Sequence, residues 1–211
     1  MKIKIKLSII LLVIIVLSAI FAPLVSPYNP LEIQKGKQFL PPSMIHYFGT
    51  DEFGRDVFSR TLYAGRISLL AGLVAVIVSA LVGVPLGLIS GYYGKIIDTC
   101  IMRTMDSLLA FPALLLALCI VAVLGPSSLN AMIAVSIVSI PNFARISRAS
   151  ILTQKEKDYV EAAVSIGASD KRIIYFTILP NCIGPILVQI TIAVAFAILV
   201  EAALSFLGLG T

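Results

Sequence analysis

Five apolar runs that are long enough, or nearly long enough, to cross a bilayer constrain the fold of this chain more than any other feature. They cover about residues 7–25, 67–90, 107–124, 127–144 and 183–207. Inside hydrocarbon every backbone N–H and C=O must be hydrogen-bonded within the protein, so runs of this length are expected to be helices. Charged residues are 13% of the 211 residues, against about a quarter in soluble domains. The sequence therefore predicts an all-α membrane protein, a polytopic helical bundle forming one transmembrane domain.

The first run has a second interpretation as the apolar core of a cleaved signal peptide, because it follows the basic start Met1–Lys6. The apolar core of a signal peptide is about 7–15 residues long, and residues 7–25 form a longer one that further spans follow. We therefore favour an uncleaved membrane helix.

The distribution of Lys and Arg predicts the orientation, because these residues concentrate in cytoplasmic segments. With the N-terminus in the cytoplasm, 11 of the 16 Lys and Arg residues fall on the cytoplasmic side and 5 on the other. Residues 26–66 are then extracytoplasmic, and residues 145–181 form a large cytoplasmic loop. Residues 92–106 are expected to form a short polar loop, which carries Lys95, Asp98, Arg103 and Asp106. Five spans leave the C-terminus outside, and residues 207–211 include no closing polar tail. We therefore expect a sixth span to be missing from this sequence.

Small side chains recur at every fourth position of the second run, and they predict close helix packing. The positions are Ala71, Ala75, Ser79, Gly83, Gly87 and Gly91. Such a stripe serves packing inside one chain as well as contact with a partner helix, and we favour the former.

The loop 145–181 carries the signals of two helices joined by a glycine turn. Thr153–Glu156 fits a capping box, which places a helix start near Thr153, and Gly167 is placed to end that helix in a left-handed turn. Ser169 can cap a second short helix, which Pro180 is expected to stop. Such a unit suits a groove on a soluble partner, and it also suits the lipid surface.

Cysteine and histidine give no sign of a metal centre. Cys100, Cys119 and Cys182 have no CxxC spacing, and His46 is the only histidine. Neither a metal site nor a set of disulfides is predicted.

Charged residues outside the loop are predicted to serve the structure. Glu201 lies deep in the fifth run, where a carboxylate is a candidate functional group, but no second buried charge accompanies it. We expect a structural hydrogen bond near the outer end of that span. Asp51, Arg55, Asp56 and Arg60 are of mixed sign, so we favour local salt bridges over substrate binding at the outer mouth.

Glu161-Ala162-Ala163, then Gly167, then Leu179-Pro180 resemble the EAA motif of ABC-importer permeases. Thr177 stands where the general motif has Ile, with Ile178 beside it. This departure affects one packing position and leaves the Glu and the Gly of the motif intact.

Two further blocks resemble dipeptide, oligopeptide and nickel importer permeases. One block precedes the second run, at Gly49, Thr50, Asp51, Gly54, Arg55, Asp56 and Arg60. The other, Glu201–Gly210, resembles the end of the fifth span of that family. The three blocks stand in the family's order and extend over nearly the whole chain.

The resemblance implies a C-type permease subunit with the transmembrane fold of type I ABC importers, in a bacterial or archaeal plasma membrane. Its implied partners are a second homologous permease, two ABC ATPase subunits and an extracytoplasmic binding protein that delivers peptides or nickel. Glu161, Ala162, Ala163, Gly167, Leu179 and Pro180 would couple it to the ATPases. This chain would bind no cofactor, and ATP with Mg²⁺ would be held by the ATPase partners.

Other functions have weaker support in the sequence. No GxxxxGK[ST] is present, so the chain has no P-loop of its own for ATP phosphates. An ion-driven secondary transporter would use buried ionisable groups near mid-membrane, for which only Glu201 is available. An intramembrane enzyme would need a motif such as HExxH or GxSxG, and neither occurs.

Overall fold

The computed structural model describes residues 2–209, with the side chains of residues 6–209, and the described chain is helical without a named strand. It divides into two compact units, Met1–Leu70 and Ala71–Thr211. The all-α prediction is confirmed for the described residues.

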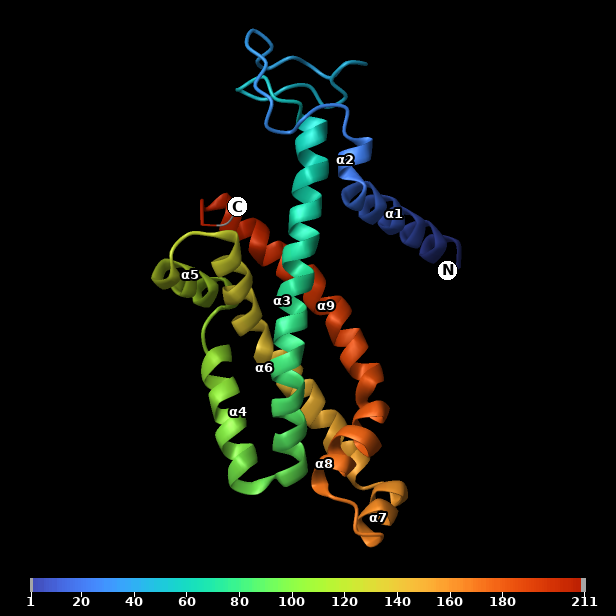
Figure 1. The fold of residues 1–211 in the computed structure, drawn as a ribbon. Helices are drawn as coiled ribbons and strands as arrows, with labels where there is room; N and C mark the ends of the chain where they lie inside the picture. The colour runs from blue at the N-terminus through green and yellow to red at the C-terminus, as the bar shows by residue number, and fades with distance from the viewer. Residues whose placement is uncertain (1, 210–211) are drawn as a thin grey trace. The chain divides into compact units, whose positions relative to one another are not determined.

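The first unit contains α1 (Lys2–Ile20), α2 (Ala22–Val25), a long irregular segment and the first turns of α3 (Val57–Tyr93) (Figure 1). The predicted first span, 7–25, is interrupted at Phe21, and Pro23 occupies the first turn of α2. Because proline has no N–H to donate to the preceding turn, a new helix starts there instead of the old one continuing. Ala19 and Ala22 are buried, and Ala19 faces Gly65 of α3.

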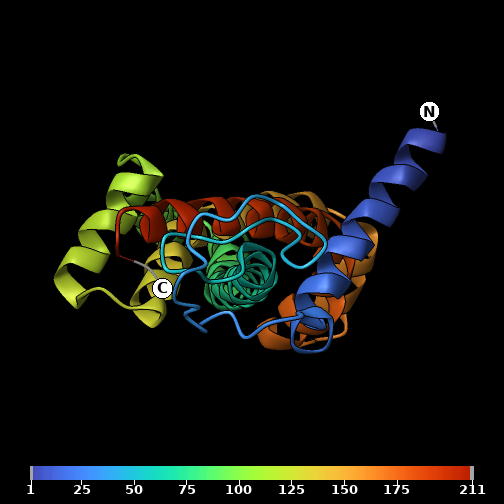
Figure 2. The same ribbon diagram turned by 90° about the horizontal axis from the view of Figure 1, so that it is seen from above.

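The second unit holds the rest of α3 and all later helices. These are α4 (Lys95–Leu109), α5 (Ala113–Leu124), α6 (Ser128–Lys155), α7 (Asp158–Ser165), α8 (Asp170–Arg172), the π-helical turn η1 (Ile173–Ile178) and α9 (Leu179–Phe206). The segments α8, η1 and α9 form one helix, Asp170–Phe206. In the view along α3, α9 lies beside it (Figure 2), and Gly72 of α3 approaches Ile198 of α9.

The predicted count of five spans is not reproduced. Among the described residues three helices, Val57–Tyr93, Ser128–Lys155 and Asp170–Phe206, are long and apolar enough to cross a membrane. A fourth span exists only if α4 and α5, bent by 90°, count as one. The apolar part of α1, Lys6–Ile20, is shorter than these helices.

The third predicted span, 107–124, is wrong as a continuous helix. It breaks between Leu109 and Ala113, because Pro112 disfavours helical geometry at Phe111 and donates no hydrogen bond. Residues 92–106, expected to be a polar loop, are instead mostly helical in α4. The predicted fourth span, 127–144, belongs to α6, which continues to Lys155.

The small-residue stripe packs inside the chain, as favoured from the sequence. A Cβ on Gly83 would lie 2.6 Å from the Ile140 carbonyl oxygen, and one on Gly87 would lie 2.2 Å from that of Ala144. Beside them Ser79 donates from its hydroxyl to the Ser136 carbonyl at 2.9 Å. The backbones of α3 and α6 are therefore in direct contact, which only small side chains allow.

We expect Gly87→Ala to destabilise the protein by about 1–3 kcal/mol, because the added methyl group meets backbone that cannot rotate away. Gly65→Ala is the matched control on the same helix, since its methyl would meet only the Ala19 Cβ, at 3.5 Å. Thermal unfolding of the detergent-solubilised variants measures both. Equal melting temperatures for the two variants would contradict the close contact.

Candidate functional site

The loop 145–181 is shorter in the structure than the sequence predicts, because α6 fills its first third. The capping box at Thr153–Glu156 is wrong: Thr153 lies inside α6, and its hydroxyl donates to the Ala149 carbonyl at 3.1 Å. Burial of Ile151 keeps this turn helical, so packing overrides the local signal. The connecting segment is therefore residues 156–169, which contain α7 and are called the α7 loop below.

Gly167 ends α7 as predicted. Its φ of +75° is in the left-handed region, and its N–H donates to the Val164 carbonyl at 2.9 Å. The next N–H, of Ala168, donates to the Ala163 carbonyl at 3.1 Å. These two bonds form a Schellman motif, in which glycine satisfies the end of a helix at little steric cost.

The second helix starts where expected but does not stop at Pro180. Ser169 occupies the cap position, although its side chain makes no capping hydrogen bond. The turn η1 widens the helix just before Pro180, with the Leu179 N–H donating to the Ile174 carbonyl. A wider turn makes room for the proline ring, so the helix continues to Phe206.

Tyr92, at the end of α3, holds both ends of the α7 loop. Its carbonyl oxygen accepts a hydrogen bond from Lys155 Nζ at 2.6 Å, and its ring centroid lies 5.3 Å from the same nitrogen. Its hydroxyl donates to Asp170 Oδ1 at 3.0 Å. Sequence reasoning missed Tyr92, because its partners lie 63 and 78 residues away along the chain.

A buried apolar cluster supports the loop from the side of the bundle. Val160 of α7 joins residues of α3, α6 and the long last helix in it, and Ala163 and Leu179 pack against its edge. The buried members are Leu88, Ile151, Val160, Ile173, Ile174, Ile178, Cys182 and Ile186. One face of α7 is thus fixed to the protein, while Ala162 and Pro180 are exposed.

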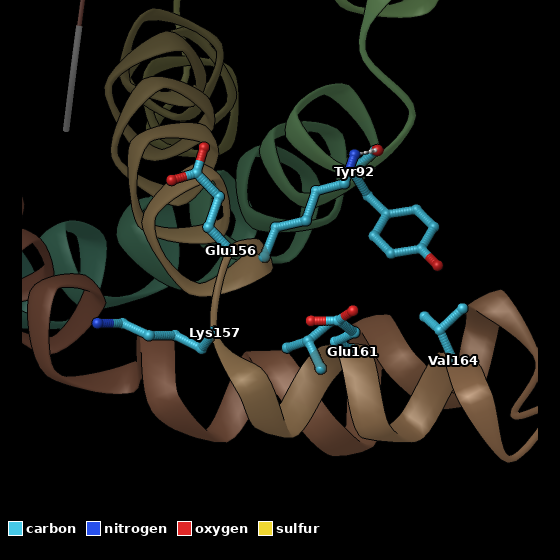
Figure 3. Close-up of a pocket in the computed structure, with 7 residues that line it drawn as sticks. Tyr92, Glu156, Lys157, Glu161 and Val164 are labelled. Carbon is cyan, nitrogen blue, oxygen red and sulfur yellow. Dashed lines mark hydrogen bonds between the residues drawn. The ribbon is translucent and has the colours of Figure 1, made fainter.

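A hollow of about 290 Å³ lies between α7 and the end of α3 (Figure 3). It is lined by Tyr92, Lys155, Glu156, Lys157, Val160, Glu161 and Val164. The Glu161 carboxylate lies on the face of α7 that is turned toward Tyr92, whereas Lys157 points away. Within the described residues Glu161 has no hydrogen-bond or ion-pair partner, so an exposed carboxylate stands beside apolar surface.

In the first unit, the motif residues between 49 and 60 form two separate clusters. Asp51 accepts hydrogen bonds from the N–H groups of Phe53 and Arg55, at 2.8 and 3.0 Å, and pairs with the guanidinium groups of Arg55 and Arg60. The expected local salt bridges are confirmed for Asp51. Burial alone would raise the pKa of Asp51, but these hydrogen bonds lower it to about 2.

Asp56 belongs to the other cluster, which the sequence did not reveal. Its Oδ1 lies 3.0 Å from Nδ1 of the buried His46, and its Oδ2 accepts from the N–H and the hydroxyl of Ser59, at 2.8 and 2.7 Å. Although burial opposes ionisation, the bonds from Ser59 and His46 lower the pKa of Asp56. Asp56 therefore caps the start of α3 and ties it to the preceding segment.

The other motif residues of this segment hold its backbone together. A Cβ on Gly49 would lie 2.3 Å from the Leu40 carbonyl oxygen, and one on Gly54 would lie 2.2 Å from that of Gln34. Thr50 donates from its hydroxyl to the Lys37 carbonyl at 2.5 Å and accepts from the Leu40 N–H at 2.8 Å. These residues fold the segment rather than forming an open cleft.

Glu201 makes the structural hydrogen bond that the sequence predicts. Its side chain is buried in α9, and Oε1 accepts from the Ser205 hydroxyl at 3.0 Å. A hydroxyl one helical turn away thus satisfies one oxygen of the carboxylate, because a polar group inside an apolar span needs a hydrogen-bond partner.

The sequence matches known protein families over most of its length. Residues 83–211 match the family described as the inner membrane component of binding-protein-dependent transport systems. The chain belongs to this family of permeases. Residues 6–42 also match the N-terminal transmembrane domain of oligopeptide transport permease C.

Named relatives of this permease include dipeptide transporters. It is 48% identical over 210 residues to the dipeptide transport system permease protein DppC of Alkalihalophilus pseudofirmus, across 98% of this chain and 69% of the relative. The DppC protein of Haemophilus influenzae is 42% identical over 209 residues, across 96% and 71%.

A solved structure supports the fold of the permease. The inward-facing MetNI methionine ABC transporter matches it with a TM-score of 0.59 and 18% identity, over 68% of this chain and 72% of that one. The expected transmembrane fold of an ABC importer is confirmed.

The Asp51 cluster predicts a stability difference that depends on pH. A carboxyl group whose pKa is lowered in the folded state stabilises that state above its ordinary pKa of 3.8, and the contribution is lost as the pH falls toward 2. We expect Asp51→Asn to lower the melting temperature at pH 7 by on the order of 4 °C, and this gap to close between about pH 4 and pH 2. Glu52→Gln, an exposed neighbour, is the control. A gap that does not vary with pH would contradict the ionic role.

At Gly167 the cost of substitution should come from backbone strain alone, because no atom of the described residues, chain neighbours aside, lies within 4 Å of an added Cβ. We expect Gly167→Ala to destabilise α7 by about 1–2 kcal/mol and Gly167→Asn by less, since asparagine enters the left-handed region more readily. Hydrogen exchange of the α7 amides measures this, and equal protection in both variants would contradict the strain.

Proposed function

We propose that this permease is a subunit of an ATP-driven importer of peptides, and that it forms the membrane pathway together with a second, homologous permease. The dipeptide permeases among its relatives support the substrate class. The family description supports delivery by a binding protein on the outer side. Nickel, the other substrate class suggested by the sequence blocks, has no support among these relatives.

We infer that the energy enters through the α7 loop, at Glu161, Ala162, Ala163, Gly167, Leu179 and Pro180. The observation that carries this proposal is the unpaired carboxylate of Glu161 beside the hollow under Tyr92. A basic side chain of an ATPase fits this place, because its stem would pack on Tyr92 and Val164 and its charge would meet Glu161. ATP hydrolysis, with Mg²⁺, would then take place on two ATPase partners, and this chain would bind neither.

The contacts that hold the α7 loop support a role in transmitting force to the membrane helices. Tyr92 binds Lys155 before α7 and Asp170 after it, and Val160 is buried below. A segment held at both ends moves with the helices that hold it. A displacement of α7 by a partner would therefore reach α3, α6 and α9 together.

The proposal also implies on which side of the membrane each segment lies. The N-terminus and the α7 loop would lie in the cytoplasm, in agreement with the excess of Lys and Arg there. Residues 26–56, with the clusters of Asp51 and Asp56, would face the outside. Gly49, Thr50, Asp51, Gly54, Arg55, Asp56 and Arg60 would serve to fold that segment beneath the binding protein.

Co-purification tests the coupling role of Glu161. We expect Glu161→Gln to lower the recovery of ATPase subunits with the epitope-tagged protein about tenfold, because a charge-assisted hydrogen bond contributes about 1.5–3 kcal/mol. Asp158→Asn is the matched control, being an exposed carboxylate one turn earlier on α7 that does not line the hollow. Mass spectrometry of the partners from native membranes gives the readout.

Two outcomes would contradict the proposal in different ways. Unchanged recovery with Glu161→Gln would exclude this residue as the contact. Isolation of the wild-type chain without any ATPase, still transporting dipeptides on a proton or sodium gradient, would favour an ion-driven secondary transporter.

A further inference from the structure

Within the second unit, helix α4 is joined to α6 by two ion pairs. Met105 is the one buried residue among its 15, so apolar burial contributes little to its position. It lies against α6 at the end of the unit that carries α7 (Figure 1). Two carboxylates of α4, Asp98 and Asp106, meet two arginines of α6 there.

The two ion pairs differ in geometry and exposure. Arg148 binds Asp98 with two parallel hydrogen bonds, Nε to Oδ1 and Nη2 to Oδ2, each at 2.5 Å. Arg145 reaches Asp106 with a single bond of 2.6 Å, and both of those side chains are half exposed, against 34% and 20% for Arg148 and Asp98. Exposed single-contact pairs contribute little to stability, whereas bidentate pairs add both energy and fixed geometry. Asp98–Arg148 is therefore the stronger link.

A third helix joins this link. The Ser90 hydroxyl of α3 donates to Asp98 Oδ1, so one carboxylate connects α3, α4 and α6. Around it, Gly87 and Gly91 bring α3 against α6, and Arg148 stands two turns before the end of α6 at Lys155. The link thus joins α3 and α6 near the helix ends at which Tyr92 and Lys155 bind each other.

We propose that Asp98, Arg148 and Ser90 are positioning residues for transport: they carry displacement of the α7 loop from α6 to α4, and through the 90° bend to α5. This inference rests on the proposed function, because it takes the ATPases to be the source of the displacement. Without the link, α4 is still joined to α3 through Gly94 but follows the displacement of α6 less closely, since it has one buried side chain. The three sequence blocks that resemble importer permeases, at 49–60, 161–180 and 201–210, do not include these three residues.

Hydrogen exchange on the assembled transporter tests the link. The complex is purified with its partners and compared without nucleotide and with MgATP plus orthovanadate. In the wild type we expect the exchange of the α4 and α6 amides to change together. In Asp98→Asn the α6 change persists, while the α4 change falls at least about fivefold, the size of a modest coupling free energy.

Two further variants separate the link from a general structural defect. The double variant Asp98→Arg with Arg148→Asp restores the opposite charges and is expected to restore most of the α4 response. Asp106→Asn, which removes the half-exposed pair, is expected to keep it.

The outcomes are distinct. An α4 response that survives in Asp98→Asn overturns the inference, and so does a charge exchange that fails to restore a lost response. If both Asp98 variants fail to assemble, the pair determines folding instead, and the inference is overturned as well. A wild-type preparation without ATPases speaks against the proposed function and not against the link.

Discussion

The backbone contact between α3 and α6 is the constraint from which the arrangement of the second unit follows. At Gly83 and Gly87 there is no room for a Cβ, so the two helices lie as close as helices can. That separation brings the end of α3 to the end of α6, where Tyr92 reaches Lys155. A larger side chain in the stripe would move the two ends apart, and the α7 loop would lose its support.

Polar links and apolar packing have different tasks in this permease. The middle parts of the helices pack against one another through buried Ala and Val side chains and through glycines. Within lipid there is no hydrophobic force that drives these helices together, so close packing has to hold them. Directional bonds are concentrated at the end that carries α7, among Asp98, Arg148, Tyr92 and Asp170. Close packing sets how near the helices lie, while these bonds join their ends to one another and to the α7 loop.

The sequence predicted what depends on local periodicity or on a single backbone conformation. The helical class, the internal packing of the small-residue stripe and the turn at Gly167 are of this kind. Sequence-based prediction failed where contacts with residues distant in the chain determine the local structure. Lys95, Asp98, Arg103 and Asp106 look like a polar loop, but α6 offers arginines to two of them, and α4 results. Thr153 likewise looks like a cap until the burial of Ile151 extends α6 past it.

The same distinction separates the motif residues of the candidate sites. Gly49, Gly54 and Asp51 are explained within the chain, since each has a close backbone contact or a bound arginine that requires it. The roles of Tyr92 and His46 were not predicted from the sequence, yet both are satisfied internally at the atoms that bind Asp170 and Asp56. Glu161 is different: its backbone is fixed by a helix that is anchored at both ends, while its carboxylate has no partner among the described residues. A rigidly held charge with no partner among the described residues is suited to bind a group from another protein, so we assign the proposed coupling contact to Glu161 rather than to the motif as a whole.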